Sequence, residues 1–193
     1  MAHYCRLFHF GSVVDWGSTP ELVTLFQPWL ILWNFIYIFF LGGPFQEEFG
    51  WSGYALPRLQ ARYSALISSV VLGVIWAIWH LPLNLMYFAG PQYQVGLAWL
   101  SSTVILFIFV SIPFTWIYNN TGGSILTALI FHTMLNLSTY VIFPVFETEN
   151  GPAYYFFLII FVAIIILAIF GTKRMVRDKN QVKTEINSRD NFG

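Results

Sequence analysis

Long apolar segments separated by short polar turns make up most of the chain from residue 26 to residue 171. A helix needs about 20 apolar residues to cross the hydrocarbon core of a membrane. The turns between the segments contain Gly, Pro, Asn and acidic residues, which end helices. The apolar segments are residues 26–43, 64–88, 95–118, 124–146 and 153–171. This pattern predicts an all-α, polytopic transmembrane helix bundle with about five spans.

The first span is predicted to break near its middle. One continuous helix over residues 26–59 would be about 50 Å long, whereas the hydrocarbon core of a membrane is about 30 Å thick. Gly42, Gly43 and Pro44 form the expected break, because Gly permits unusual backbone angles and Pro lacks an amide proton. Such breaks occur in membranes where protein or a water-filled cavity satisfies the freed backbone groups.

Composition places the chain among integral membrane proteins. Hydrophobic residues make up 57% of it and charged residues only 9%, whereas soluble domains average about 25% charged residues. The formal net charge is zero, which gives no sign of nucleic-acid binding. Six of the nine basic residues follow Gly171, so the positive-inside rule predicts a cytoplasmic C-terminus for a multi-pass protein of the cell (plasma) membrane.

These features divide the chain into three parts. Residues 1–25 form an N-terminal segment whose role the pattern does not indicate, residues 26–171 form the transmembrane domain, and residues 172–193 form a basic polar tail. The predicted partner of such a chain is the lipid bilayer.

The adjacent residues Glu47 and Glu48 are the main candidates for chemistry. Ionisable groups are costly inside a membrane and mark functional sites there. A helix rises 1.5 Å per residue, so Glu47 lies about 20 Å from the turn that follows its helix. His80 lies about 24 Å and His132 about 15 Å from the turns that precede their helices. These candidates are therefore expected at similar depth in the membrane.

Helical spacing places two pairs of polar or aromatic residues on shared helix faces. His80 follows Trp76 by four residues and Asn136 follows His132 by four, so each pair shares a helix face. His132 and Asn136 can then donate hydrogen bonds to one oxygen. A transmembrane His is about as often an interhelical hydrogen-bonding group as a catalytic one. An Asn more often joins helices than takes part in a reaction. The tryptophans are expected to pack in the core or at the membrane interface.

Three segments together resemble the CAAX-protease and bacteriocin-processing family of intramembrane peptidases. Residues 47–59 (EEFGWSGYALPRL) resemble its first motif, residues 76–82 (WAIWHLP) its second, and residues 131–136 (FHTMLN) its third. The type 2 CAAX prenyl proteases are the best-known branch. The resemblance implies a membrane-embedded endopeptidase acting on a membrane-associated peptide or a lipidated protein.

The resemblance also implies roles for the candidates. Glu47 would activate a water molecule with Glu48 beside it, His80 would help to hold that water, and His132 with Asn136 would stabilise the oxyanion. This mechanism needs no cofactor. If a metal is used, zinc is the alternative, with Glu47, His80 and His132 as its ligands. The chain lacks the HExxH helix that is typical of zinc peptidases.

The first motif departs from the family at position 52. Members usually carry an Arg four residues after the second Glu, where it can pair with that carboxylate, and this chain has Ser52. Glu48 is therefore expected to lack a cationic partner on its own helix. Two alternatives to a peptidase follow: an inactive or weak relative acting in bacteriocin immunity or processing, and a proton-coupled transporter, which also uses intramembrane Glu and His.

Overall fold

The computed structural model describes residues 28–88, 97–143, 145 and 150–176, and the regular elements in these ranges are all helices. They are α2 (Pro28–Leu41), α3 (Pro44–Gly50), a π-helical turn (Trp51–Ala55), α4 (Leu56–Gln60), α5 (Ala65–Phe88), α6 (Leu97–Asn120), α7 (Ile125–Leu137), a second π-helical turn (Ser138–Ile142) and α8 (Gly151–Phe170). This confirms the prediction of an all-α fold.

The helices have the length and composition of a polytopic membrane protein. Four described segments are long and apolar enough to cross a membrane, and the bent pair at the start of the bundle adds a fifth. The four are Ala65–Pro82, Ser101–Asn120, Ile125–Ile142 and Gly151–Phe170. Aromatic side chains on their outer faces, such as Phe157 and Phe161, are more than 60% exposed, as expected for residues that contact lipid. The protein is an integral, multi-pass membrane protein.

The predicted break in the first span is present. Trp29–Leu41 and Pro44–Gln60 are bent by 42° relative to each other. Gly43 adopts a φ of 109°, which an L side chain rarely adopts, and Pro44 occupies the first turn of α3. The side-chain amide of Gln46 donates to the carbonyl of Phe40 at 2.9 Å, so one carbonyl at the end of α2 is satisfied across the break.

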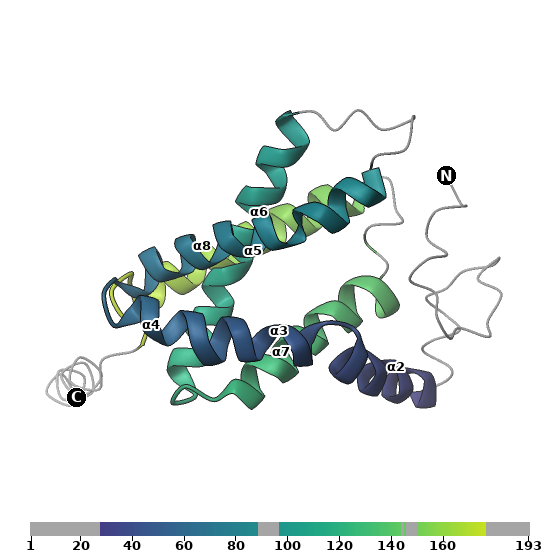
Figure 1. Cartoon of the computed structure of the whole chain (residues 1–193), viewed down its shortest axis with the longest axis horizontal. Coiled ribbons are helices and arrows are strands. Elements are labelled where there is room, and N and C mark those ends of the chain that lie inside the picture. The colour runs from purple at the N-terminus through teal and green to yellow at the C-terminus, as the bar shows by residue number, and fades with distance from the viewer. Residues whose placement is uncertain (1–27, 89–96, 144, 146–149, 177–193) are drawn as a thin grey trace, which may run out of the picture.

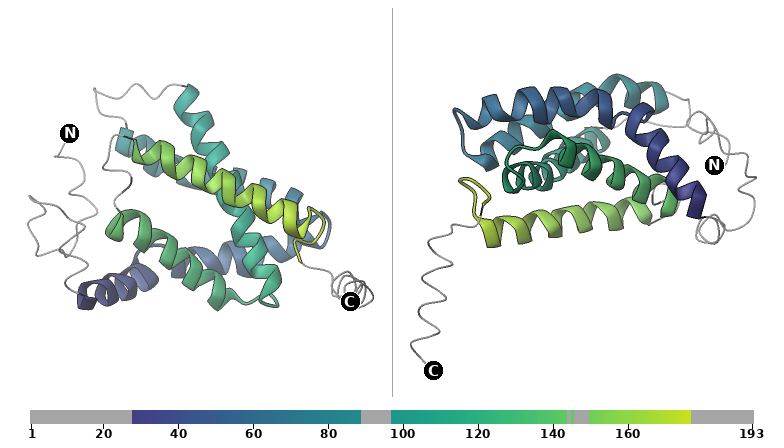
Figure 2. Two further views of the ribbon diagram at one scale, coloured as in Figure 1. Left: turned by 180° about the vertical axis from the view of Figure 1, so that it is seen from behind. Right: turned by 90° about the horizontal axis from the view of Figure 1, so that it is seen from below.

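Helix α6 lies between α5 and α8, while α2 and α3 pack against α7 (Figure 1). The view from below in Figure 2 shows α8 on the far side of α6 and α7 from α3 and α4. Gly73 allows α5 and α6 to approach closely, since a Cβ atom there would lie 2.5 Å from the Cα of Ile108. This packing brings one face of each of α3, α5 and α7 together in the interior.

The chain turns back on the bundle after α8. The carbonyls of Lys173 and Thr172 accept hydrogen bonds from the backbone amides of Ala65 and Leu66 at 2.9 and 3.0 Å. These two amides lie in the first turn of α5 and have no partner within their own helix. The segment after α8 therefore caps α5.

Two asparagines at the end of α6 hold the same segment. The Asn119 side chain donates to the carbonyl of Arg174, and the Asn120 side chain donates to that of Met175, each at 2.8 Å. The Met175 side chain is fully buried in the core. The predicted boundary between transmembrane domain and tail falls after Gly171, and the described chain stays bonded to the bundle as far as Met175. Residues 1–27 and 177–193, with the predicted N-terminal segment and most of the tail, lie outside the described residues.

Candidate active site

The two adjacent glutamates of α3 occupy different environments. Glu48 has no exposed surface, whereas Glu47 is half-buried. Neighbouring residues of a helix point about 100° apart, so the two carboxylates cannot lie on one face. Glu48 points into the bundle towards α7, and Glu47 points towards α5.

Both carboxylate oxygens of Glu48 have hydrogen-bond partners. His132 Nδ1 of α7 lies 2.8 Å from Oε1, and the hydroxyl of Ser52 donates to Oε2. His132 is 5% exposed and Ser52 is 1% exposed. A buried carboxylate is costly unless it is paired and hydrogen-bonded, and this arrangement satisfies it from two helical segments.

Position 52 therefore supplies a neutral hydrogen-bond donor to Glu48 in place of the cation that family members usually carry there. Ser52 shares a helix face with Glu48, as its spacing predicts. Arg58 takes no part in this pairing. Its guanidinium lies 3.6 Å from the centre of the Tyr54 ring and donates to the Tyr54 carbonyl at 3.0 Å.

Glu47 accepts hydrogen bonds from two tryptophans. Trp76 Nε1 of α5 donates to Glu47 Oε2 at 2.9 Å, and Trp51 Nε1 donates to the same oxygen at 3.3 Å. Trp76 packs in the core as expected, and both indoles in addition donate to Glu47, which the sequence analysis did not predict. The signal was present in the spacing, because Trp51 follows Glu47 by four residues and a buried indole N–H usually needs a partner.

Trp76 also contacts both candidate histidines. Its ring centre lies 5.3 Å from that of His132 and 6.1 Å from that of His80, and it is 4% exposed. His80 Nδ1 is 3.1 Å from the Trp76 carbonyl, to which it can only donate. One buried indole thus joins Glu47 on α3, His80 on α5 and His132 on α7.

Two phenylalanines of α6 form an apolar wall behind these groups. The Phe114 ring lies 5.3 Å from His132 and 5.2 Å from Trp76. The Phe107 ring lies 4.8 Å from His80 and 5.2 Å from Trp76. Sequence reasoning did not single out either residue, since Phe is frequent on every helix of the chain. The wall fixes the orientation of the imidazole and indole rings and keeps the polar groups in an apolar surrounding.

Asn136 is the one predicted residue that these contacts do not include. It lies one turn after His132 on α7 and is half-buried. Its described hydrogen bond involves its backbone carbonyl, which accepts from Thr139 at 3.4 Å. Within the described residues, its side-chain amide makes no hydrogen bond to the glutamates or histidines, so its role stays a prediction.

The positions of these side chains also show whether they can hold a metal ion together. Within the described ranges, no three His, Cys, Asp or Glu side chains are grouped closely enough to hold one ion. Glu47 faces indole donors, and His132 faces Glu48. The predicted ligands Glu47, His80 and His132 therefore do not fit a three-ligand zinc site as they are folded here.

Comparison with known proteins gives two matches. Residues 28–138 match the family model of the type II CAAX prenyl endopeptidase Rce1-like proteins. Over 97 residues, the chain is 37% identical to CAAX prenyl protease 2 of Methanococcus maripaludis. That alignment covers 48% of this chain and 35% of the relative, so the chain spans about a third of the relative's length.

The region matched by the family model contains all five predicted site residues, and with them the helices that bring Glu47, Glu48, His80 and His132 together around Trp76. It also covers more than half of the chain. The chain therefore belongs to the Rce1-like family of type II CAAX prenyl endopeptidases.

Proposed function

We propose that this protein is an intramembrane endopeptidase that hydrolyses a peptide bond of a substrate delivered by the membrane. The observation that carries the proposal is the difference between the two glutamates. Glu48 is fully buried and paired with His132 and Ser52, whereas the half-buried Glu47 lies between two indole donors. Adjacent carboxylates in different environments can take different roles in one reaction.

Glu47 is the proposed general base. Its described hydrogen bonds both end on Oε2, so Oε1 is the oxygen that can accept a proton from water. Oε1 lies beside Gly43, where a Cβ atom would come within 2.9 Å of it. The glycine at the helix break thus leaves space next to the reactive oxygen. The indole donors of Trp51 and Trp76 hold the carboxylate in one orientation.

His132 is the proposed donor to the oxyanion. Its Nδ1 lies 2.8 Å from the Glu48 carboxylate, so donation to the oxyanion through Nε2 requires a proton on both ring nitrogens. Asn136, one turn further on α7, is the proposed second donor. His80 is proposed to hold the attacking water, since its Nδ1 is engaged by the Trp76 carbonyl and leaves Nε2 for this contact.

The proposed reaction follows from these roles. Glu47 takes a proton from water, and the hydroxide attacks the carbonyl carbon of the scissile peptide bond. His132 and Asn136 stabilise the negative charge on the carbonyl oxygen of the tetrahedral intermediate. The intermediate collapses as the C–N bond breaks, and the proton held by Glu47 passes to the leaving amine. No cofactor enters this scheme.

The proposed substrate class is a membrane-associated peptide or protein, with lipidated CAAX-type C-termini as the first candidates. The family and the relative carry names that refer to prenyl endopeptidase and prenyl protease activity. We place the protein in the cell membrane with its C-terminus in the cytoplasm, because six basic residues follow Gly171.

Cleavage by the purified full-length chain in lipid bilayers tests the proposal. The probe is a fluorescent peptide that ends in a prenylated CAAX sequence. The same peptide without the prenyl group is assayed for comparison. We expect Glu47→Gln to lower the rate at least a hundredfold, because the variant keeps the shape of the side chain but cannot take the proton. Phe49→Leu, an exposed change on the same helix, is the matched control and should cleave at the wild-type rate.

Unchanged cleavage by Glu47→Gln would remove Glu47 from the mechanism. If the folded wild-type chain cleaves neither peptide, proton uptake into vesicles becomes the decisive measurement. Uptake that depends on Glu47 would replace the peptidase by a transporter. Absence of both activities would favour the inactive relative.

A further inference from the structure

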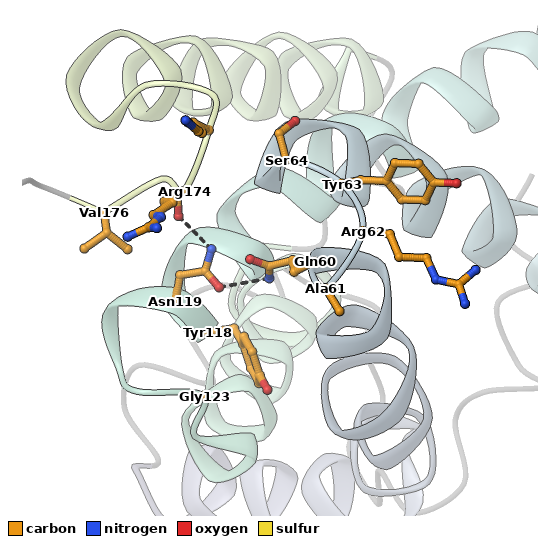
Figure 3. Close-up of a pocket in the computed structure, with 11 residues that line it drawn as sticks. Gln60, Ala61, Arg62, Tyr63, Ser64, Tyr118, Asn119, Gly123, Arg174 and Val176 are labelled. Atoms are coloured by element: carbon orange, nitrogen blue, oxygen red, sulfur yellow. Dashed lines mark hydrogen bonds between the residues drawn. The ribbon is translucent and has the colours of Figure 1, made fainter.

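A pocket of about 560 Å³ lies at the end of the bundle where α4, α6 and α8 end (Figure 3). None of the residues that line it belongs to the candidate active site. Three of them are basic: Arg62 in the turn before α5, and Lys173 and Arg174 in the segment after α8. Figure 3 shows Arg62 on one side of the pocket and Arg174 on the other.

The positive charge of this pocket is not neutralised by the described part of the chain. The acidic residues described there are Glu47 and Glu48, and both belong to the candidate active site. The three basic residues of the pocket are exposed, and the described ion pair is the one between Glu48 and His132. An anion from outside the described chain is the natural complement of such a pocket.

A fixed polar network forms the base of the pocket. Gln60 Nε2 donates to Asn119 Oδ1 at 2.9 Å, and Asn119 Nδ2 donates to the Arg174 carbonyl at 2.8 Å (Figure 3). These bonds join the end of α4, the end of α6 and the segment after α8. The backbone of Arg174 is therefore held in place before any ligand binds, which lowers the entropic cost of binding.

The position of the pocket indicates which anion it meets. The pocket lies at the ends of membrane-spanning helices, and it therefore faces the headgroup layer of one leaflet. Tyr63, an exposed aromatic on its rim, is a residue type enriched at that depth. Basic pockets between transmembrane helices bind phosphate-containing lipid headgroups. We propose that this pocket binds the phosphate of an anionic phospholipid headgroup.

Lipid binding to the delipidated full-length protein tests this proposal. Native mass spectrometry in detergent would measure the affinity for phosphatidylglycerol and for zwitterionic phosphatidylcholine. We expect wild-type protein to prefer phosphatidylglycerol, and Arg62→Gln combined with Arg174→Gln to weaken that binding roughly thirtyfold, about fivefold for each charge. Arg174→Lys retains the charge and should bind within about twofold of wild type.

Arg58→Gln is the matched control, because Arg58 is a nearby exposed cation outside the pocket that is engaged by Tyr54. It should leave lipid affinity unchanged. An equal loss in Arg58→Gln and the double variant would overturn the proposal, since general surface charge would then explain the binding. Displacement of the lipid by millimolar inorganic phosphate would overturn the lipid assignment in favour of free phosphate. Thermal unfolding without added lipid checks that each variant is folded.

Discussion

The Ser52 hydroxyl donates a hydrogen bond to the Glu48 carboxylate one helical turn before it, and both side chains are buried. His132 of α7 contacts the other oxygen of the same carboxylate at 2.8 Å. A hydroxyl and an imidazole from two helical segments thus give both oxygens of this buried carboxylate a hydrogen-bond partner. This relationship separates the buried, paired carboxylate of Glu48 from the half-buried Glu47.

Replacing Ser52→Ala tests the hydroxyl as a partner of Glu48. The variant leaves one oxygen of a buried carboxylate without its donor, which costs about 1–3 kcal/mol. We expect a lower temperature of unfolding and cleavage reduced about tenfold. Ser111→Ala is the matched control, since Ser111 is also buried but donates to a neutral backbone carbonyl, that of Phe107. Equal losses in the two variants would mean that packing and not the carboxylate bond sets the effect.

His132→Ala should be the most damaging single change in the site. It removes one partner of a buried pair and leaves Glu48 uncompensated, which lowers the free energy of unfolding by about 3 kcal/mol. Cleavage should fall below detection. Met134→Leu, an exposed change on the same helix, serves as control.

A double-mutant cycle of His132→Gln and Glu48→Gln measures the free energy of the interaction between these two side chains, apart from what each contributes to stability by itself. We expect a coupling energy of about 1.5–3 kcal/mol, as for a hydrogen bond to a charged group. Additive effects on unfolding would show that the two side chains contribute independently, contrary to the pairing described above.

Trp76→Phe tests the indole donor to Glu47. Phenylalanine keeps an aromatic ring between the two histidines but lacks the N–H that donates at 2.9 Å. We expect about a tenfold or larger fall in kcat with KM little changed, because the base loses its orientation while substrate contacts remain. Trp79→Phe is the control, since Trp79 is 63% exposed. A wild-type kcat for Trp76→Phe would reduce this indole to a packing residue.

Gly43→Ala tests the break in the first span. At a φ of 109° an Ala is strained by about 1–2 kcal/mol, and its Cβ would lie 2.9 Å from Glu47 Oε1. Both effects should move the carboxylate, so cleavage should fall more than stability alone explains. Gly50→Ala, where a Cβ meets open space, should have neither effect. Comparing the rates of the two variants at equal folded fraction isolates the displacement of Glu47.

Removal of metal tests the proposed water-activation mechanism directly. We expect cleavage to continue after dialysis against a strong chelator, with metal content measured in the same sample. Loss of activity that returns with zinc would replace Glu47 as the base by a metal-bound water. An inert metal ion added to the chelated protein controls for ionic strength.

The sequence alone determined the class of the protein, the spans and the break. Apolar length decides which segments can cross a membrane, and Gly43 and Pro44 act on the backbone locally, so neither needs tertiary information. The same holds for the shared faces of Glu48 with Ser52 and of His80 with Trp76, since they follow from helical spacing. The candidate residues came from the cost of charge in a membrane and from the resemblance of three short motifs.

The tertiary structure decided which carboxylate is buried and which donors each one meets. Glu47 and Glu48 are adjacent in the sequence, and only the packing of α3 against α7 and the contact with Trp76 of α5 make their surroundings different. Trp76 could not be distinguished from a packing tryptophan, because its partner lies 29 residues away on another helix. The sequence likewise did not indicate that residues 172–175 bind the bundle, since they do so through backbone carbonyls that bond to α5 and α6. Contacts between distant parts of the chain depend on how helices pack, and local composition does not encode them.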